Sequence, residues 1–233
     1  QEVGTIGSII KEVYTTRGMV EDYWVSVSVS DPATPDKYLG GKDVWDTAES
    51  SLEEAAKQFD LPYKRIEGEA AFYGPKLDFM FKDAIGRQWQ LATIQLDFNL
   101  PNRFDLSYVN EQGEKERPVV IHRAISGSLE RFMGVMIEHF AGVFPLWLAP
   151  RQAIVVPVGE KFNDYAEKVL KSLKDGGIRA EGDFSSDGLN KKVRNAEQAH
   201  INYILVVGEK EEANNGVAVR NYKTKEQTEE SAV

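Results

Sequence analysis

Hydrophobic and polar positions alternate along several segments in the first part of this 233-residue chain. Valine alternates with serine in residues 24–30, and leucine or phenylalanine occupies every second position in residues 77–82. A period of two is typical of strands with one buried face. The short turn at residues 83–86 leads into a further run at residues 87–98, so we expect these two strands to pair antiparallel.

Other segments space apolar residues three and four positions apart, which predicts amphipathic helices. One helix is expected around residues 6–14. Another is expected around residues 45–59, with its start at Asp43 or Asp46. Residues 110–113 predict a further hairpin. Antiparallel strands with flanking helices together predict an α+β fold for this part of the chain.

The pattern changes after residue 150. An apolar run at residues 153–158 precedes a helical stripe at residues 162–173, and strand and helix then alternate up to about residue 221. This order predicts a mixed α/β domain whose sheet is mostly parallel. The polar tail after Lys225 is expected to fray. Two prolines bracket an apolar patch at residues 144–151, which is typical of a short connection, so we predict domains at residues 1–149 and 150–233.

The segment from residue 118 to residue 140 carries the clearest chemistry. It predicts a strand that ends near His122 and a helix with Arg131 in its second turn. Arg131 borders the apolar stripe of that helix and needs a partner, because a charge is costly to bury alone. Phosphate suits its planar fork, and a carboxylate on a neighbouring strand is the alternative. The face predicted to be buried consists of Leu129, Phe132, Met133, Met136, Ile137 and Phe140.

Composition restricts the function further. Cysteine is absent, so any metal must use His, Asp, Glu or water. The net charge of -9 argues against indiscriminate nucleic-acid binding, although the second domain is close to neutral. No apolar run is long enough to span a membrane and no secretory leader is visible, so we expect a cytoplasmic protein without a membrane partner.

Four segments together resemble the threonyl-tRNA synthetases, a family of class II aminoacyl-tRNA synthetases. They are YGPKLDF at residues 73–79, ATIQLDF at 92–98, PVVIHRAISGSLERF at 118–132 and FPLWLAPRQ at 144–152. The resemblance covers nearly the whole chain. It implies part of an antiparallel class II catalytic sheet with helices, followed by an anticodon-binding domain. It also implies a role in joining threonine to tRNA(Thr), with ATP and Mg²⁺ as activating reagents.

The resemblance also implies roles for single residues in catalysis and ATP binding. Arg131 matches the arginine of class II motif 3, which would hold the γ-phosphate. Gln90 would lie near phosphate and ribose, and Lys76 would face the adenylate or the substrate carboxylate, with a solvated lysine as the alternative. Ser128 would bind the ribose or adenine side, or would simply cap the start of its helix.

A threonine pocket is implied as well. Tyr73, Gln95 and Thr93 would line it, with a core tyrosine and a buried amide as the alternatives for the first two. Family members hold zinc with one cysteine and two histidines, and His122 matches the last of these ligands. Zinc can bind both the amino group and the hydroxyl of threonine and so reject valine, which an apolar pocket separates poorly. One histidine cannot form a zinc site alone, and a lone histidine is usually structural.

In the second domain, Glu211 and Arg220 match positions that the family uses near anticodon bases. Unpaired bases are read by stacking and by hydrogen bonds to their edges, which an acidic acceptor can supply. Lys191, Lys192 and Arg194 are candidates for phosphate contacts, although exposed charges are more often only solvated.

Several parts of such an enzyme are not found in this sequence: motif 1, which builds the dimer interface, motif 2, and an editing domain. We therefore expect a fragment of a homodimeric synthetase that is inactive by itself. Two alternatives remain, namely another class II synthetase, prolyl or histidyl, and a non-catalytic tRNA-binding relative. Arg131, Gln90 and Gln95 argue against the second, because a binding module does not need a phosphate-binding arginine.

Overall fold

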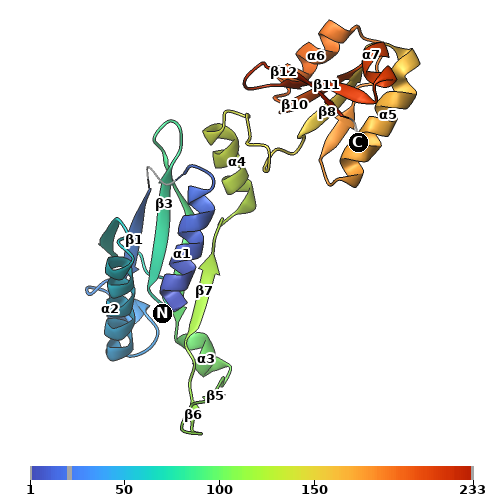
Figure 1. The fold of residues 1–233 in the computed structure, drawn as a ribbon. Helices are drawn as coiled ribbons and strands as arrows, with labels where there is room; N and C mark the ends of the chain where they lie inside the picture. Colours follow the sequence, from blue (N-terminus) through green and yellow to red (C-terminus); the bar gives the residue numbers. More distant parts are fainter. Residues whose placement is uncertain (1, 20–22, 232–233) are drawn as a thin grey trace. The chain divides into compact units, whose positions relative to one another are not determined.

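The computed structural model describes residues 2–19 and 23–231. The chain divides into two compact units, Gln1–Glu138 and His139–Val233. Figure 1 shows the first unit in blue to green and the second in yellow to red. Among the described residues, each unit is built on a five-stranded sheet with helices, and the first also holds a two-stranded hairpin. The expected combination of an α+β part and a mixed α/β part is confirmed.

The elements of the first unit follow the chain in this order: α1 (Glu2–Thr15), β1 (Tyr23–Val29), the 3-10 helix η1 (Pro35–Lys37), α2 (Lys42–Gln58), β2 (Tyr63–Glu67), β3 (Lys76–Lys82), β4 (Gln88–Asp97), α3 (Asn99–Arg103), β5 (Tyr108–Val109), β6 (Lys115–Glu116), β7 (Val120–Ala124) and α4 (Leu129–His139).

The strand order in the sheet of the first unit is β2-β1-β3-β4-β7. The predicted antiparallel pairing of β3 with β4 is confirmed, and so is the hairpin of β5 and β6. β1 and β7 also join their neighbours β3 and β4 antiparallel. The sequence pattern did not indicate β2, which is parallel to β1 and is reached through α2.

One face of this sheet carries the apolar core. Val25, Val27 and Val29 are fully buried, as their alternation predicts. Tyr14 of α1 stacks on Phe81 of β3 with 3.9 Å between the ring centroids. Figure 1 shows α1 lying along the sheet. The helix thus covers the apolar face, and the opposite face is left for polar side chains.

Two helix predictions need correction. α2 begins at Lys42, after the extended residue Gly41, and not at Asp43 or Asp46. In α4, half of the expected buried face is exposed: Leu129 is 66%, Met133 61% and Ile137 51% accessible. The apolar stripe of α4 is wider than its contact with the rest of the unit. Phe132 packs edge-on against Tyr14 at 6.1 Å and Met136 is buried, whereas the other side of the stripe turns outward.

The second unit contains β8 (Ala153–Pro157), the 3-10 helix η2 (Glu160–Phe162), α5 (Asn163–Asp175), β9 (Ala180–Gly182), α6 (Leu189–Gln198), β10 (Tyr203–Val207), α7 (Glu209–Ala213), β11 (Gly216–Asn221) and β12 (Gln227–Ser231). Its strand order is β12-β11-β10-β8-β9. One apolar cluster packs Val155 and Leu205 against α5, and another packs Ile154 and Ile204 against α6.

The sheet of the second unit is less parallel than expected. β8 is parallel to β9 and β10, but β11 is antiparallel to both β10 and β12. The prediction of a frayed tail after Lys225 is wrong, because β12 pairs along β11. A polar edge strand is held by backbone hydrogen bonds, which hydropathy does not reveal. Across the described residues, no helix is both long and apolar enough to cross a bilayer.

Candidate active site

Polar side chains gather on the face of the first sheet that lies opposite the core. Gln95 of β4 is paired with His122 of β7 and with Lys76 of β3. Thr93 is paired with Asp78 of β3. Directly opposed residues of an antiparallel pair point to the same face. The structure thus brings the predicted residues Lys76, Thr93, Gln95 and His122 to one surface.

Gln90 reaches this face only because β4 contains a bulge. The pairing register shifts between Phe79 and Met80 of β3, which leaves Leu91 as an extra residue in β4. In a regular strand, Gln90 and Thr93 are three positions apart and would point to opposite faces. With the bulge, Gln90 Nε2 lies 3.0 Å from Thr93 Oγ1. Plain alternation along the sequence does not predict this arrangement.

Asp78 is a residue of this site that sequence reasoning missed. Its side chain is buried, and its Oδ1 accepts hydrogen bonds from Gln90 Nε2 at 2.5 Å and Thr93 Oγ1 at 2.8 Å. Its Oδ2 accepts from the Lys76 amine and from Ser28 Oγ at 3.1 Å. Lys76 is therefore not a merely solvated lysine. The signal in the sequence is a carboxylate between two buried strand residues, because such a group must find partners.

The predicted threonine-pocket residues Tyr73 and Gln95 touch each other. The Tyr73 hydroxyl donates to Gln95 Oε1 at 2.9 Å, and Gln95 Nε2 lies 3.4 Å from the Gly74 carbonyl oxygen. A Cβ atom on Gly74 would lie 1.8 Å from the Leu96 carbonyl oxygen, so this close approach requires glycine. The Tyr73 ring meets the His122 ring edge-on at 6.2 Å. These contacts also satisfy the Tyr73 hydroxyl and the Gln95 amide, as the purely structural alternative expects.

Asp97 is the second residue that sequence reasoning missed. His122 Nε2 lies 2.8 Å from Asp97 Oδ2, and the backbone N–H groups of Asn99 and Leu100 donate to Oδ1 at 2.8 and 3.0 Å. Burial raises the pKa of Asp97, but the hydrogen bonds from His122 and the two amides outweigh it, so this pKa lies below its usual value.

The bond to Asp97 determines which nitrogen of His122 is free. A carboxylate only accepts, so in the neutral ring Nε2 carries the proton and Nδ1 keeps the lone pair. Histidines that bind metals usually have such a carboxylate behind them. The described residues contain no group of three or more His, Asp or Glu side chains that could hold a metal ion. His122 therefore fits a metal ligand in its chemistry but does not complete a site.

Arg131 lies in α4, close to the bulge of β4. Its Nη1 donates to the Gln90 carbonyl oxygen at 3.1 Å, and its guanidinium lies 5.9 Å from the centroid of the Trp89 ring. In the described part of the chain these partners are neutral, so the carboxylate pairing considered from the sequence is not formed. The loop before α4 approaches the bulge closely, because a Cβ on Gly127, whose φ is +62°, would lie 2.5 Å from the Leu91 carbonyl oxygen.

Ser128 acts as a helix cap in the structure. Its hydroxyl accepts the backbone N–H of Arg131 at 3.2 Å and donates to Glu130 Oε2 at 2.9 Å. This is the structural alternative considered from the sequence. A contact with the ribose or adenine stays a prediction.

In the second unit, the predicted anticodon residues have different neighbours. Arg220 of β11 forms an ion pair with Glu197 of α6 at 3.1 Å. Glu211 lies in α7, close enough to Tyr165 of α5 to help raise the pKa of its hydroxyl, which burial raises most. The structure therefore does not join Glu211 and Arg220 in one pair.

The prediction for Lys192 as a phosphate contact is wrong. Lys192 is only 3% exposed, and its amine donates to the carbonyl oxygens of Pro157 and Asp183 at 3.4 and 3.1 Å. Lys191 forms an exposed ion pair with Asp187 at 2.9 Å.

Two family models match the chain. The tRNA synthetase class II core domain (G, H, P, S and T) matches residues 2–140, and the anticodon binding domain matches residues 152–232. The first match covers more than half of the chain and includes the polar face of the first sheet, Arg131 and the start of α4.

Similar proteins agree with these matches. A threonine--tRNA ligase of Thermus thermophilus is 53% identical over 221 residues, which are 95% of this chain and 33% of the relative. The chain thus spans about a third of the length of the curated relatives it matches. The crystal structure of the RNA binding domain of threonyl-tRNA synthetase from Cryptosporidium parvum superimposes with a TM-score of 0.91 at 39% identity, covering 99% of this chain and 57% of that chain.

A second solved structure, putative threonyl-tRNA synthetase ThrRS-1 from Aeropyrum pernix, gives a TM-score of 0.68 at 34% identity and covers 96% of this chain and 55% of that one. The chain therefore belongs to the class II tRNA synthetases of the G, H, P, S and T group, and it matches threonyl-tRNA synthetases over nearly its whole length.

Proposed function

We propose that this chain supplies part of the active site and the anticodon-binding domain of a threonine–tRNA ligase. In the first reaction, the threonine carboxylate attacks the α-phosphate of ATP, which gives threonyl-adenylate and pyrophosphate. In the second, the threonyl group moves to the terminal ribose of tRNA(Thr). Because the chain spans about a third of its relatives, the activity belongs to a full-length synthetase that carries it, and the isolated chain is expected to be inactive.

The availability of Arg131 is the observation that carries this proposal. Its guanidinium is steadied by the Gln90 carbonyl and the Trp89 ring, while no carboxylate neutralises it within the described residues. A positioned arginine of this kind stabilises the charge of the γ-phosphate of ATP as pyrophosphate leaves. Lys76, held by Asp78, keeps two further N–H groups for the adenylate or the substrate carboxylate. Mg²⁺ would bind together with ATP. Ser128 lies at the same end of α4 as Arg131.

The threonine pocket would use Tyr73, Gln95 and Thr93 on the polar face. His122 would hold zinc through Nδ1, since Asp97 binds its Nε2. Zinc, when bound, would coordinate the amino group and the hydroxyl of threonine and so disfavour valine. A catalytic zinc site has about three protein ligands, so the remaining ligands must come from outside the described residues.

The second unit would bind the anticodon of tRNA(Thr). Glu211 remains the better placed of the two candidates, because Arg220 must leave or share its ion pair with Glu197 before it can meet a base. We further propose that the full-length enzyme is a homodimer and acts in the cytoplasm, as expected for a translation enzyme.

An amino-acid-dependent exchange assay tests the proposal. A full-length synthetase that carries this chain should exchange labelled pyrophosphate into ATP with threonine, and much more slowly with valine, proline or histidine. It should also charge tRNA(Thr). Faster exchange with proline or histidine would mean that the chain belongs to a prolyl- or histidyl-tRNA synthetase instead. Binding of tRNA without exchange for any of these amino acids would identify a non-catalytic relative.

A further inference from the structure

Asp78 lies at the centre of the polar face of the first sheet. It is 4% exposed and is paired with Ser26 of β1 and Thr93 of β4. A carboxylate offers about four lone-pair positions. Donors from Gln90, Thr93, Lys76 and Ser28 occupy two positions on each oxygen, so the carboxylate is held in one orientation. Three of these four donors are candidates for contact with the substrates.

Asp78 decides which end of the Gln90 amide points inward. Gln90 Nε2 donates to Asp78 Oδ1 at 2.5 Å and to Thr93 Oγ1 at 3.0 Å, which uses both of its N–H bonds. Thr93 in turn donates its hydroxyl hydrogen to Asp78 at 2.8 Å. A flipped amide would set Gln90 Oε1 against a carboxylate oxygen, acceptor against acceptor, and both hydrogen bonds would be lost.

The orientation of the amide determines what Gln90 can bind. Its Oε1 is the polar atom left for a ligand, and the side chain is exposed. A carbonyl oxygen accepts hydrogen bonds and repels phosphate oxygens, which are acceptors themselves. Gln90 therefore suits a hydrogen-bond donor. ATP offers the two ribose hydroxyls and the adenine amino group, and the ribose is the part next to the phosphates that Arg131 and Lys76 would hold. This narrows the earlier expectation, which placed Gln90 near both phosphate and ribose.

We propose that Asp78 is a positioning residue of the reaction: it holds Lys76, Thr93 and Gln90 in place and turns the Gln90 carbonyl toward a ribose hydroxyl of ATP. The inference deepens the proposed function and rests on it. Preorganised groups of this kind accelerate a reaction because they need no rearrangement when the substrate arrives. Asp78 itself touches no substrate in this proposal.

The first test needs no enzyme activity. In the 233-residue chain, the side-chain NH₂ signals of Gln90 are assigned by NMR in the unmodified protein and in Asp78→Asn. The hydrogen bond to Asp78 should shift these signals and slow their exchange with water, and both effects should disappear in the variant. Signals of Gln90 that are the same in both proteins, with the fold intact, would overturn the assignment whatever the enzyme assay gives.

The second test uses a full-length synthetase that carries the chain, with ATP, 2′-deoxy-ATP and 3′-deoxy-ATP in the pyrophosphate exchange assay. Unmodified enzyme should lose about 3–10-fold in kcat/KM with the analogue that lacks the bound hydroxyl. Asp78→Asn should lose about 10–100-fold with ATP and show no further loss with that analogue, since the partner of the hydroxyl is already displaced.

Glu49→Gln is the matched control. Glu49 is also a buried carboxylate, and it accepts hydrogen bonds from the backbone N–H and hydroxyl of Ser30 and from Arg65. Its variant should lose stability but keep the ATP and deoxy-ATP kinetics. If Asp78→Asn behaves like this control, or if its loss simply multiplies with the loss from the missing hydroxyl, Asp78 is only structural and the inference fails. Failure of the proposed function is distinct, because then the unmodified enzyme shows no threonine-dependent exchange.

Discussion

His122 and Asp97 are joined by a 2.8 Å hydrogen bond between Nε2 and Oδ2, and the Asp97 side chain is fully buried. The buried Asp97 carboxylate therefore fixes the orientation of the His122 imidazole ring. In Asp97→Asn, the new side-chain NH₂ group must face either the ring N–H of His122 or the backbone N–H groups of Asn99 and Leu100, so that donor meets donor. We expect the zinc affinity of a full-length synthetase that carries the chain to fall about 10–100-fold, measured by competition with a chelator.

Asp83→Asn is the control for this experiment, since Asp83 is equally enclosed but is bonded to Arg87 and Trp89. It should leave zinc affinity unchanged. Equal zinc affinity in both variants would mean that Asp97 serves only the turn into α3.

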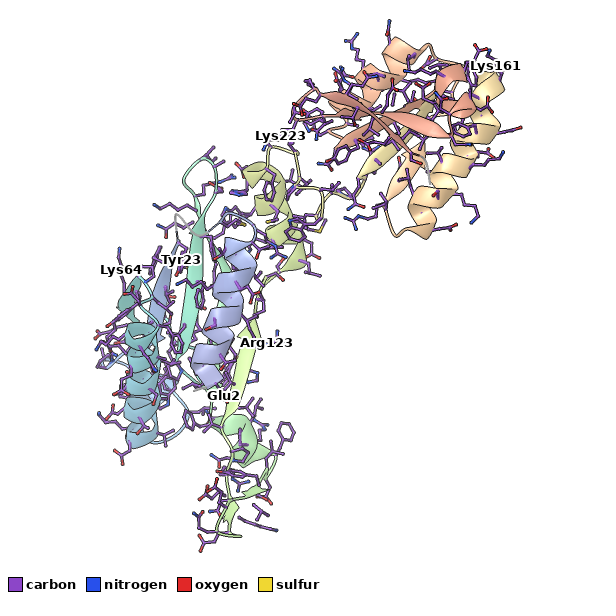
Figure 2. All side chains as sticks on the ribbon, in the orientation of Figure 1. Glu2, Tyr23, Lys64, Arg123, Lys161 and Lys223 are labelled. Carbon is purple, nitrogen blue, oxygen red and sulfur yellow. The ribbon has the colours of Figure 1, made fainter. Side chains whose placement is uncertain are left out.

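Arg131→Ala should remove a charge-assisted contact that forms fully in the transition state. We expect a loss of about 3–4 kcal/mol, or about 10²–10³ in the rate of threonine-dependent exchange, with nearly normal folding and tRNA binding. Arg123→Ala is the control. Arg123 is exposed on β7, where Figure 2 labels it, and its pairing with Ile94 places it on the other face of the sheet. Similar rates in both variants would identify Arg131 as a structural residue.

Gly74→Ala should disturb the Tyr73–Gln95 contact. The new Cβ would lie 1.8 Å from the Leu96 carbonyl oxygen, so the segment that holds Tyr73 has to move. We expect a loss of about 1–3 kcal/mol in unfolding free energy, measured with urea. Gly7→Ala, in α1, meets no atom within 4 Å and should be neutral or stabilising by about 0.5–1 kcal/mol. Equal stability of the two variants would contradict the close packing described here.

Asp83 should give the first unit a pH-dependent stability. Burial raises its pKa, but hydrogen bonds from Trp89, Arg87 and the Ile85 backbone outweigh burial and lower the pKa to about 2. The same group in an unfolded chain has a pKa of about 4. Its stabilisation is therefore complete above about pH 4 and is lost as the pH falls toward 2. The difference in urea midpoint between the unmodified chain and Asp83→Asn should shrink over this range. A constant difference down to pH 2 would exclude this linkage.

Limited proteolysis tests the predicted domain boundary at residues 149 and 150. Gln152 donates to the Leu146 carbonyl at 2.8 Å, and Arg179 donates to the carbonyls of Ala149 and Trp147 at 2.9 and 2.8 Å. These bonds, with one from Asn202 to the Phe144 carbonyl at 3.0 Å, tie residues 144–152 to the second unit, so we expect the first cut between residues 140 and 143. Early cleavage at residues 149–152 would instead favour the boundary predicted from the sequence.

Periodicity in the sequence predicted elements whose burial follows the pattern, such as the valines of β1 and the apolar strand β8. It failed where backbone pairing forms a strand, or where contacts from distant segments bury a side chain. β12 is a polar edge strand, and Lys192 is buried because carbonyl oxygens from two distant segments, at Pro157 and Asp183, meet its amine. The exposed part of the α4 stripe has the same composition as the buried part, so hydropathy cannot separate them.

The candidate site was partly predictable for a similar reason. The resemblance located residues that would face substrates, and most of them share the polar face. Asp78 and Asp97 were missed because their roles depend on partners. Those partners lie on three strands for Asp78, and on β7 and the start of α3 for Asp97, and they are brought together only by strand register.

Leu91 is the extra residue that makes the bulge in β4. Deleting this residue would make the pairs Ala92–Phe79 and Gln90–Met80 consecutive, so β4 would pair regularly with β3 and Gln90 would stay on the polar face. Drawing Leu91 itself into regular pairing would instead turn Gln90 toward the apolar core and Trp89 away from it. A related sequence with one residue fewer between Gln90 and Thr93 would therefore place both side chains on the polar face by plain alternation, without a bulge.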